Sequence, residues 1–559
     1  MSQNEDSSTV PAPRPAAPVT TGSPVPQHSE ATRLLCAGTY LDPEFRRRIL
    51  RELVEHGERA AAPSLGIDAV TVLAHALRAR LREALTGLWV LAVWSAFVLV
   101  DTKLADSGQF TGLWALAYAV PYVLLWIAAV VGGRSGLDLY GTGPRAITTT
   151  GRDAAGRRWL WRLRVRLVLR IVAYLQMIVY WYFALRTLVD GALTGVVFPL
   201  LLVGPVWAYR TGVERIARDE LSAAAFPGAA PPGLPDTYRG TTVAIAQEQY
   251  SRLAVYDFDR PFVGYGIPYE PWSLAVELKR RPGGPGGEQL TSRRVIELIL
   301  PRLAALRQAT AASSRDRLKD LEVAHLVYLP PPPQRADVAR DVASVDRHVG
   351  GSVDEGGEAR RYFLRVRVGA WSEQVVVTIL VRVHTQGGML VLEVVPHVLP
   401  PVRPEFREVD RLVARGGGAR ALVRALLTAP TSSVAAVVSM GDTLASVVRT
   451  WLSDAARLPG EGPAASVREL GASREVSLFQ KMDVSRYVKT VRDRIASGVT
   501  EALRESGYET GEFEQYIVNV NEGGVYIGAM SGGAVASGPG ARATARTDGG
   551  AGSAGGAGA

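Results

Sequence analysis

The stretch that decides the fold begins with residues 84–100, which read ALTGLWVLAVWSAFVLV, and residues 113–131, which read LWALAYAVPYVLLWIAAVV. Residues 167–188 and 191–209 are apolar over similar lengths. A helix rises about 1.5 Å per residue, and about 20 apolar residues are needed to cross the core of a bilayer. The sequence therefore predicts a membrane protein with four transmembrane helices over residues 84–209.

Basic residues beside these four segments predict how the block is oriented. Arginines precede the first segment and follow the fourth, and an Arg-rich loop over residues 132–166 separates the second from the third. All of these basic stretches belong to one side, so we predict a bacterial inner (plasma) membrane protein with both termini in the cytosol. The loop side chains expected to contact anionic lipid headgroups are Arg157, Arg158, Arg162, Arg164 and Arg166.

Composition limits the partners and the chemistry. The chain has 559 residues, enough for two or three domains, and a formal net charge of +9. No basic face stands out within a soluble segment, so we expect no nucleic-acid partner. The single cysteine, Cys36, excludes an intramolecular disulfide. The histidines form no HExxH pattern and there is no cysteine pair, so we expect no metal site and no cofactor.

The remaining sequence is expected to lie in the cytosol. Residues 1–30 are polar and rich in proline, which predicts a disordered tail. Residues 31–83 repeat apolar side chains at three- and four-residue steps, with an Asp-Pro pair at one helix start, and predict a small helical domain. Proline-rich residues 227–237 are expected to be a linker into an α+β domain over residues 238–458.

The α+β prediction rests on a change of periodicity along this domain. Alternating or continuously apolar runs predict strands over residues 272–278, 323–329, 361–368, 374–384 and 390–397. The last three form a meander, with Gly387-Gly388 as the turn between the second and the third. A capped amphipathic helix is predicted over residues 291–312, and the pattern is helical again over residues 406–458.

A second linker is expected over residues 459–475, before a segment that spans residues 476–528. This segment begins with an amphipathic helix, FQKMDVSRYVKTVRDRIASGVTEALRES, and continues with strands over residues 516–527. The apolar face of the helix needs a partner, either the core of the domain or another chain. Residues 529–559 are rich in Gly, Ala and Ser and predict a flexible tail.

The densest aromatic cluster, YDFDRPFVGYGIPYEPW at residues 256–272, is the candidate ligand pocket. Its candidate residues are Asp257, Asp259, Arg260, Tyr265 and Trp272. The cluster contains Gly-x-Gly but lacks the third glycine and the lysine of phosphate-binding loops, so a loop packed by its own aromatic rings is the alternative. No Walker loop, kinase motif set or nucleophile elbow occurs, and we assign no catalytic residue.

Two resemblances rest on particular residues. The segment ATRLLCAGTYLDPEF, the four spans and the ending FQKMDVSRYVKTV…GGVYIGAMSGG together resemble a group of uncharacterised actinobacterial multi-pass membrane proteins, which implies no activity. Val525, Tyr526, Ile527 and Gly528 are similar to the core of amyloid-type signalling motifs, although Tyr526 stands where that motif has Gln. These four residues are the candidate self-association segment, with an edge strand of the soluble domain as the alternative.

The sequence favours a non-enzymatic membrane scaffold or sensor that presents a cytosolic α+β interaction domain to a protein partner or to a second copy. A component of a transport or channel system is the alternative from another class. Carboxylates in the middle of a span would favour that alternative, and the predicted spans contain none. An enzyme with an unrecognised cytosolic site is the third hypothesis, and its site would lie near Asp257 to Arg260.

Overall fold

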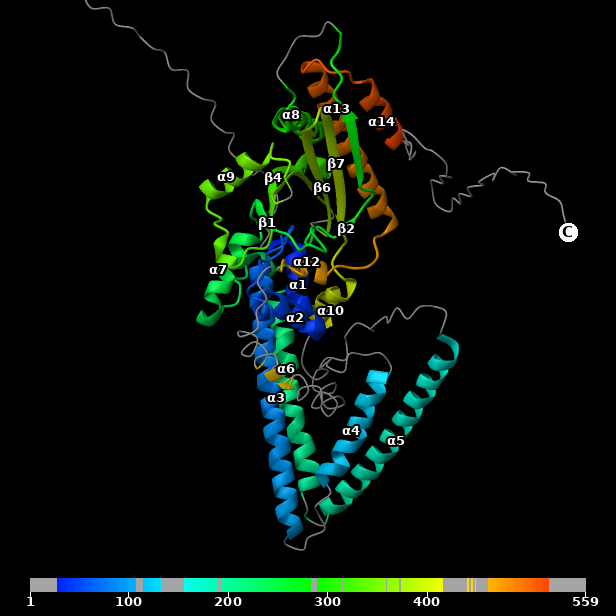
Figure 1. The fold of residues 1–559 in the computed structure, drawn as a ribbon. Helices are drawn as coiled ribbons and strands as arrows, with labels where there is room; N and C mark the ends of the chain where they lie inside the picture. The colour runs from blue at the N-terminus through cyan, green and yellow to red at the C-terminus, as the bar shows by residue number, and fades with distance from the viewer. Residues whose placement is uncertain are drawn as a thin grey trace, which may run out of the picture.

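The computed structural model describes residues 28–106, 114–131, 155–189, 191, 193–282, 289–313, 316–357, 359–370, 374–415, 440–441, 444–445, 448 and 461–521. A globular body of sheet and helices lies at one end, and four helices project from it (Figure 1). Residues 1–27 of the predicted tail 1–30 and the whole predicted tail 529–559 lie outside the described residues. Residues 29 and 30 are not part of a disordered tail, because Ser29 caps helix α1 (Glu30–Leu41).

The projecting helices are α3 (Ala69–Asp106), α4 (Trp114–Val131), α5 (Ala155–Val189) and α6 (Thr194–Asp219). Within the described residues, α3, α5 and α6 are long and apolar enough to cross a membrane, whereas the apolar part of α4 is shorter. Three spans are therefore supported and the fourth is not confirmed. Helix α5 begins at Ala155. The predicted loop over residues 132–166 is therefore wrong over residues 155–166, which are helical.

The four helices form two pairs that diverge towards the body (Figure 1). Helix α3 lies along α6, and α4 lies along α5. The pairs meet at an aromatic cluster, in which the Tyr118 ring of α4 lies 5.8 Å from the Trp94 ring and 6.5 Å from the Phe97 ring of α3, measured between ring centroids. Over residues 167–189 of α5, most side chains are apolar and uncovered, which is the surface that a bilayer would cover.

The N-terminal helices are α1 (Glu30–Leu41) and α2 (Pro43–Leu50), followed by the π-helical turn η2 (Arg51–Glu55). Asp42 begins α2 as the sequence predicts, because its carboxylate accepts hydrogen bonds from the Glu44 and Phe45 N–H groups. A separate helical domain over residues 31–83 is not confirmed. The apolar faces of α1 and α2 pack against α3, α6 and residues 402–412 in one shared core.

The body is built on one mixed sheet whose predicted strands are present. Its strands are β1 (Leu253–Val255), β2 (Ile267–Pro268), β3 (Trp272–Glu277), β4 (Glu322–Leu329), β5 (Arg361–Ala370), β6 (Val375–Gln386) and β7 (Met389–Leu399). Their order is β1-β4-β5-β6-β7-β2, with β3 also paired to β7 and with β1 parallel to β4. Gly387 and Gly388, with φ of 58° and 77°, make the predicted turn between β6 and β7, where positive φ suits a tight hairpin.

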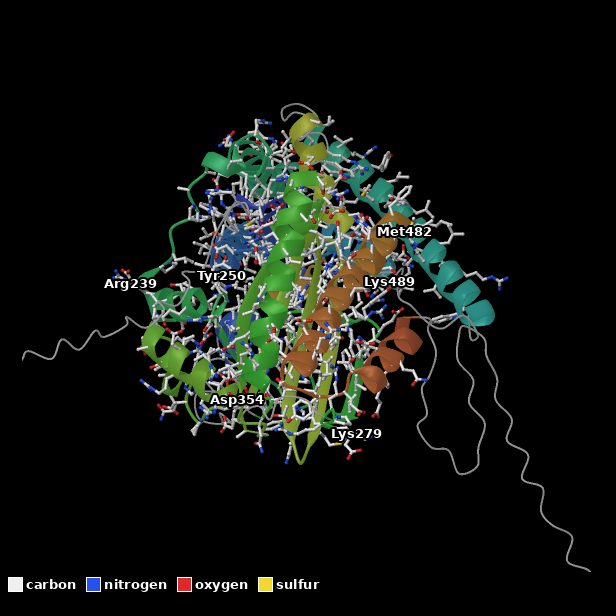
Figure 2. The ribbon with its side chains drawn as sticks, turned by 90° about the horizontal axis from the view of Figure 1, so that it is seen from above. Arg239, Tyr250, Lys279, Asp354, Met482 and Lys489 are labelled. Carbon is white, nitrogen blue, oxygen red and sulfur yellow. The ribbon has the colours of Figure 1, made fainter. Side chains whose placement is uncertain are left out.

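Helices surround this sheet, and α8 and α13 lie side by side across one face (Figure 2). The remaining helices are α7 (Arg239–Glu248), α8 (Ser292–Ser313), α9 (Val342–Ser352), α10 (Glu408–Arg415), α12 (Val467–Leu470), α13 (Leu478–Glu505) and α14 (Gly511–Asn521). Short 3₁₀ turns are η3 (Phe226–Gly228), η4 (Asp236–Tyr238), η5 (Arg317–Asp320), η6 (Arg335–Asp337) and η7 (Pro404–Arg407). The apolar face of α13 packs into the core of the domain, which was one of the two predicted partners.

Two predictions near the C-terminus are wrong within the described residues. Residues 516–521 belong to helix α14 and not to a strand, because Phe513 is buried and Tyr516 and Ile517 pack beside it at helical spacing. Residues 461–475 are not a free linker, since α12 buries Val467 and Arg468 between the N-terminal helices and the sheet. Most of the predicted helical stretch 406–458 lies outside the described residues, apart from α10 and a few positions near residue 444.

Candidate functional site

The most elaborate polar arrangement in the described residues lies where the projecting helices enter the body (Figure 1). We call it the junction, and define it as α1, α2, the first four turns of α3, the last turns of α6 and residues 402–412. These parts share one apolar core, which includes Leu35, Phe45, Ile49, Leu73, Leu77, Val213, Ile216, Val402, Phe406 and Val409. Segments far apart in sequence therefore share the same buried surface.

A buried ion pair joins α2 to α3 inside the junction. The guanidinium of Arg46 pairs with the carboxylate of Glu83, and their side chains are 4% and 2% exposed. Arg46 also donates a hydrogen bond to the Thr39 carbonyl oxygen at 2.9 Å. Two charges that have left water are tolerated only while each keeps its partner. The pair therefore fixes α2 to α3 one residue before the first predicted span.

Two further ion pairs hold residues 402–412 against the N-terminal helices. Asp42 accepts a hydrogen bond from Arg403 at 2.8 Å, and the Arg403 guanidinium lies 5.4 Å from the Phe45 ring centroid and 4.8 Å from that of Phe406. Arg33 contacts Asp410 at 2.7 Å. Strand β7 ends at Leu399, so both ion pairs involve residues that follow shortly after the end of a central strand.

The end of α6 is tied to α3 and α1 by a third set of contacts. Arg78 on α3 pairs with Glu220 after α6 at 2.6 Å. Beside them, the Tyr40 hydroxyl of α1 lies 3.2 Å from His75 Nδ1. Burial raises the pKa of Tyr40 well above its usual value, so the hydroxyl stays protonated. Helices α1, α2 and α3, and the residue directly after α6, thus each make at least one polar contact with another element.

The structure does not bring the five candidate pocket residues together. Asp257 accepts hydrogen bonds from the Asp259 and Arg260 N–H groups, both at 3.1 Å, and these three residues form an exposed turn. Tyr265 is fully buried on one face of the sheet, whereas Trp272 packs against the core on the other face.

The aromatic loop is held down by its neighbours. The N–H groups of Gly264 and Gly266 donate to the Glu469 carboxylate at 2.8 and 2.9 Å, and Arg260 donates to the Ala464 carbonyl oxygen. Positive φ values of 103° and 89° at the two glycines allow this close approach. Burial lowers the pKa of His397, whose ring lies tilted at 60° to the Phe262 ring of the loop, with 5.0 Å between the centroids. The arrangement is that of a loop packed by its own aromatic rings.

The other predicted site residues are placed as follows. Arg157, Arg158 and Arg162 lie on the first turns of α5, and their side chains are outside the described residues. Arg164 is exposed and Arg166 is half-buried on the same helix. Val525, Tyr526, Ile527 and Gly528 lie outside the described residues. Among the residues that the structure describes, no three His, Cys, Asp or Glu side chains are arranged to hold a metal ion.

Comparison with known proteins adds one finding. A family model described as an AbeC-like domain matches residues 271–534. No curated protein matches the chain, and no solved structure matches it. The matched region begins just before β3 and contains α8, strands β3 to β7 and α13, but not the projecting helices. The junction lies across its boundary, because Arg403, Phe406 and Asp410 are inside the region and their partners on α1 and α2 are outside it.

Sequence reasoning missed the junction as a site. The arginines and acids of residues 31–83 look like the polar faces of amphipathic helices, and Glu83 looks like a residue at the edge of a span. The one available signal was Asp42, whose role as a helix start was predicted, because an aspartate that caps a helix still has a second oxygen free for a cation. The identity of that cation, Arg403, could not be read from spacing.

Proposed function

We propose that this protein is a non-enzymatic integral membrane scaffold or sensor in which the junction couples the membrane helices to a cytosolic α+β interaction domain. One observation carries the proposal: α3 and α6 share an apolar core with the residues that follow β7, while ion pairs join α3 to α2 through Glu83 and join those residues to the start of α2 through Asp42. A simple anchor would need only a linker at this place. If α3 or α6 changes position, a continuous packed surface can transmit that movement to the sheet, whereas a flexible linker cannot.

The proposal includes all four spans, with α4 as the fourth, and an orientation in a bacterial plasma membrane. Trp114–Val131 is uniformly apolar, and α5 covers only part of it. The arginines at the body end of α3, α5 and α6 support a cytosolic body. The resemblance to actinobacterial multi-pass membrane proteins supports the same arrangement, and the AbeC-like region would then lie in the cytosol.

Reporter fusions test this orientation. Fusions after Gly151 and at Ala223 should report the cytosol, because both positions lie beside Arg-rich stretches. A fusion near Asp106, where α3 ends, should report the exterior. Cytosolic activity of the Asp106 fusion would contradict the proposed topology.

Hydrogen exchange tests the coupling itself. In Glu83→Gln, the buried Arg46 loses its charged partner at the membrane end of the junction, and amide exchange should rise in α2, in residues 402–412 and at the end of β7. The measurement is mass spectrometry of the full chain in detergent. Glu44→Gln serves as the control, because Glu44 is exposed and pairs only within α2. If the exchange of Glu83→Gln rises in α2 and α3 alone, the junction does not couple the two parts.

The proposed partner is a cytosolic protein or a second copy of this chain, and Val525 to Gly528 is the proposed contact. The segment is low in charge and rich in β-prone residues, as backbone pairing between chains requires. Deleting residues 522–545 from the full chain should lower the sedimenting mass in detergent. Deleting residues 546–559 is the matched control. An unchanged mass after the first deletion would exclude this contact.

A further inference from the structure

A second feature lies at the body end of the α3–α6 pair, on a different face from the junction core. Arg82 precedes Glu83 on α3, and its guanidinium rests against α6 at Gly212. A Cβ atom on Gly212 would lie 2.7 Å from Arg82 Nη1, closer than such atoms approach. The absence of a side chain at residue 212 is therefore what allows the Arg82 guanidinium to lie across the α6 backbone.

Positive charge is in excess where Arg82 of α3 crosses α6 at Gly212. Arg215 lies three residues after Gly212 on α6, which places it on the same side of that helix. Across the described part of the chain, no carboxylate forms an ion pair with Arg82 or Arg215. Glu83 pairs with Arg46, and Glu220, directly after α6, pairs with Arg78. Glu214 lies two residues after Gly212, which places it on another side of α6. Asp219 lies one turn beyond Arg215 and forms no ion pair with it in that part of the chain.

Apolar surface continues from these cations along the predicted span. Leu85 and Trp89 follow Arg82 by three and seven residues, which places them on the same face of α3. Their side chains are 49% and 67% exposed. Leu201, three turns before Gly212 on the same side of α6, is also exposed. Figure 1 shows α3 and α6 side by side over this length.

We propose that the seam between α3 and α6 binds an anionic phospholipid, whose phosphate is held by Arg82 and Arg215 and whose acyl chain lies along Leu85 and Trp89. This proposal rests on the proposed membrane insertion. Two cations at the start of a span, directly beside exposed apolar side chains, complement a molecule with an anionic head and an apolar tail. A soluble phosphate would match the charge and leave the apolar surface uncovered.

Lipid retention by the full chain in a neutral detergent tests the proposal, with native mass spectrometry as the readout. Phosphatidylglycerol should bind more tightly than phosphatidylcholine with the same acyl chains. Each basic residue near an anionic headgroup contributes about a factor of five to ten, so the double variant R82Q/R215Q should weaken phosphatidylglycerol binding about thirty-fold at low salt. Gly212→Val keeps both arginines and should weaken binding as well, because its side chain displaces the Arg82 guanidinium. Arg218→Gln removes an exposed arginine further along α6 and should change little.

Three outcomes would overturn the site. These are equal retention of the two lipids, unchanged binding by the double variant, and full competition by glycerol 3-phosphate, which would make it a site for soluble phosphate. Alkaline carbonate removes proteins that are not inserted in the membrane. Carbonate extraction therefore distinguishes a failure of the lipid-site proposal from a failure of the proposed membrane function. If the chain stays in the membrane while the lipid results fail, only the seam proposal is wrong. If carbonate releases the chain, membrane insertion itself is wrong.

Discussion

A Glu83→Ala variant should unfold with a free energy about 3–5 kcal/mol lower than the wild type, the usual cost of leaving one member of a buried ion pair without its partner. Arg46 would stay buried, since its side chain is 4% exposed and its neighbours are apolar helices. The Thr39 carbonyl oxygen, which also accepts a hydrogen bond from Arg46, is neutral and cannot balance the charge. Denaturant and thermal unfolding of the detergent-solubilised chain would measure the loss.

Two comparisons make this result specific. The double variant R46M/E83L replaces both charges with apolar side chains of similar volume, so it should recover most of the lost stability. Arg48→Ala removes an exposed pair with Glu44 on the same helix, and should cost only about 0.5 kcal/mol. If Glu83→Ala and Arg48→Ala unfold at the same midpoint, the Arg46–Glu83 pair does not hold the junction together.

A Phe406→Ala variant should lose about 3–5 kcal/mol of stability, because a fully buried ring would be replaced by a cavity. The Phe406 ring is 0% exposed and lies 4.9 Å from the Phe45 ring, and the Arg403 guanidinium covers it at 4.8 Å. Its edge also fills the space that a side chain at Gly38 would need. The loss should therefore loosen α1 and α2 from residues 402–412, and limited proteolysis should then cut near residue 404 faster.

Phe258→Ala is the matched control for this prediction. Phe258 is 71% exposed in the aromatic loop, and its ring contact is with Tyr256 at 5.3 Å. Its removal should change the free energy of unfolding by about 0.5 kcal/mol or less. Equal effects of the two substitutions would mean that Phe406 contributes no more than a surface ring, and the shared core would then not be needed for folding.

The match to the AbeC-like domain model bears on both variants. Phe406 lies inside residues 271–534, whereas Glu83, Arg46 and Phe45 lie outside them. Because the region's own residues 402–412 are buried by helices from outside it, a fragment limited to residues 271–534 would expose that apolar surface. The body and the projecting helices α3 and α6 are therefore one packing unit at the junction, and boundaries drawn at residue 238 or 271 cut through it.

Local sequence was sufficient for the elements whose physical cause is local. The apolar runs predicted helices α3, α5 and α6 because a span is defined by its own composition. Alternating or continuously apolar runs predicted strands β3 to β7, and the Gly387-Gly388 pair predicted the turn, since a tight hairpin needs positive φ at both positions. Asp42 was recognised as a helix start from its own neighbourhood along the chain.

Tertiary structure alone decided the partners. Asp42 and Arg403 are 361 residues apart, and Arg33 and Asp410 are 377 apart, so neither ion pair leaves a pattern within any short window. The same limit explains the errors at residues 516–521 and 461–475, where packing against distant helices overrode β propensity and a loop-like composition. Periodicity reports that one face of an element is buried, and it carries no information about which other element covers that face. That choice depends on long-range packing, where polar groups leave water together and each must find a partner in three dimensions.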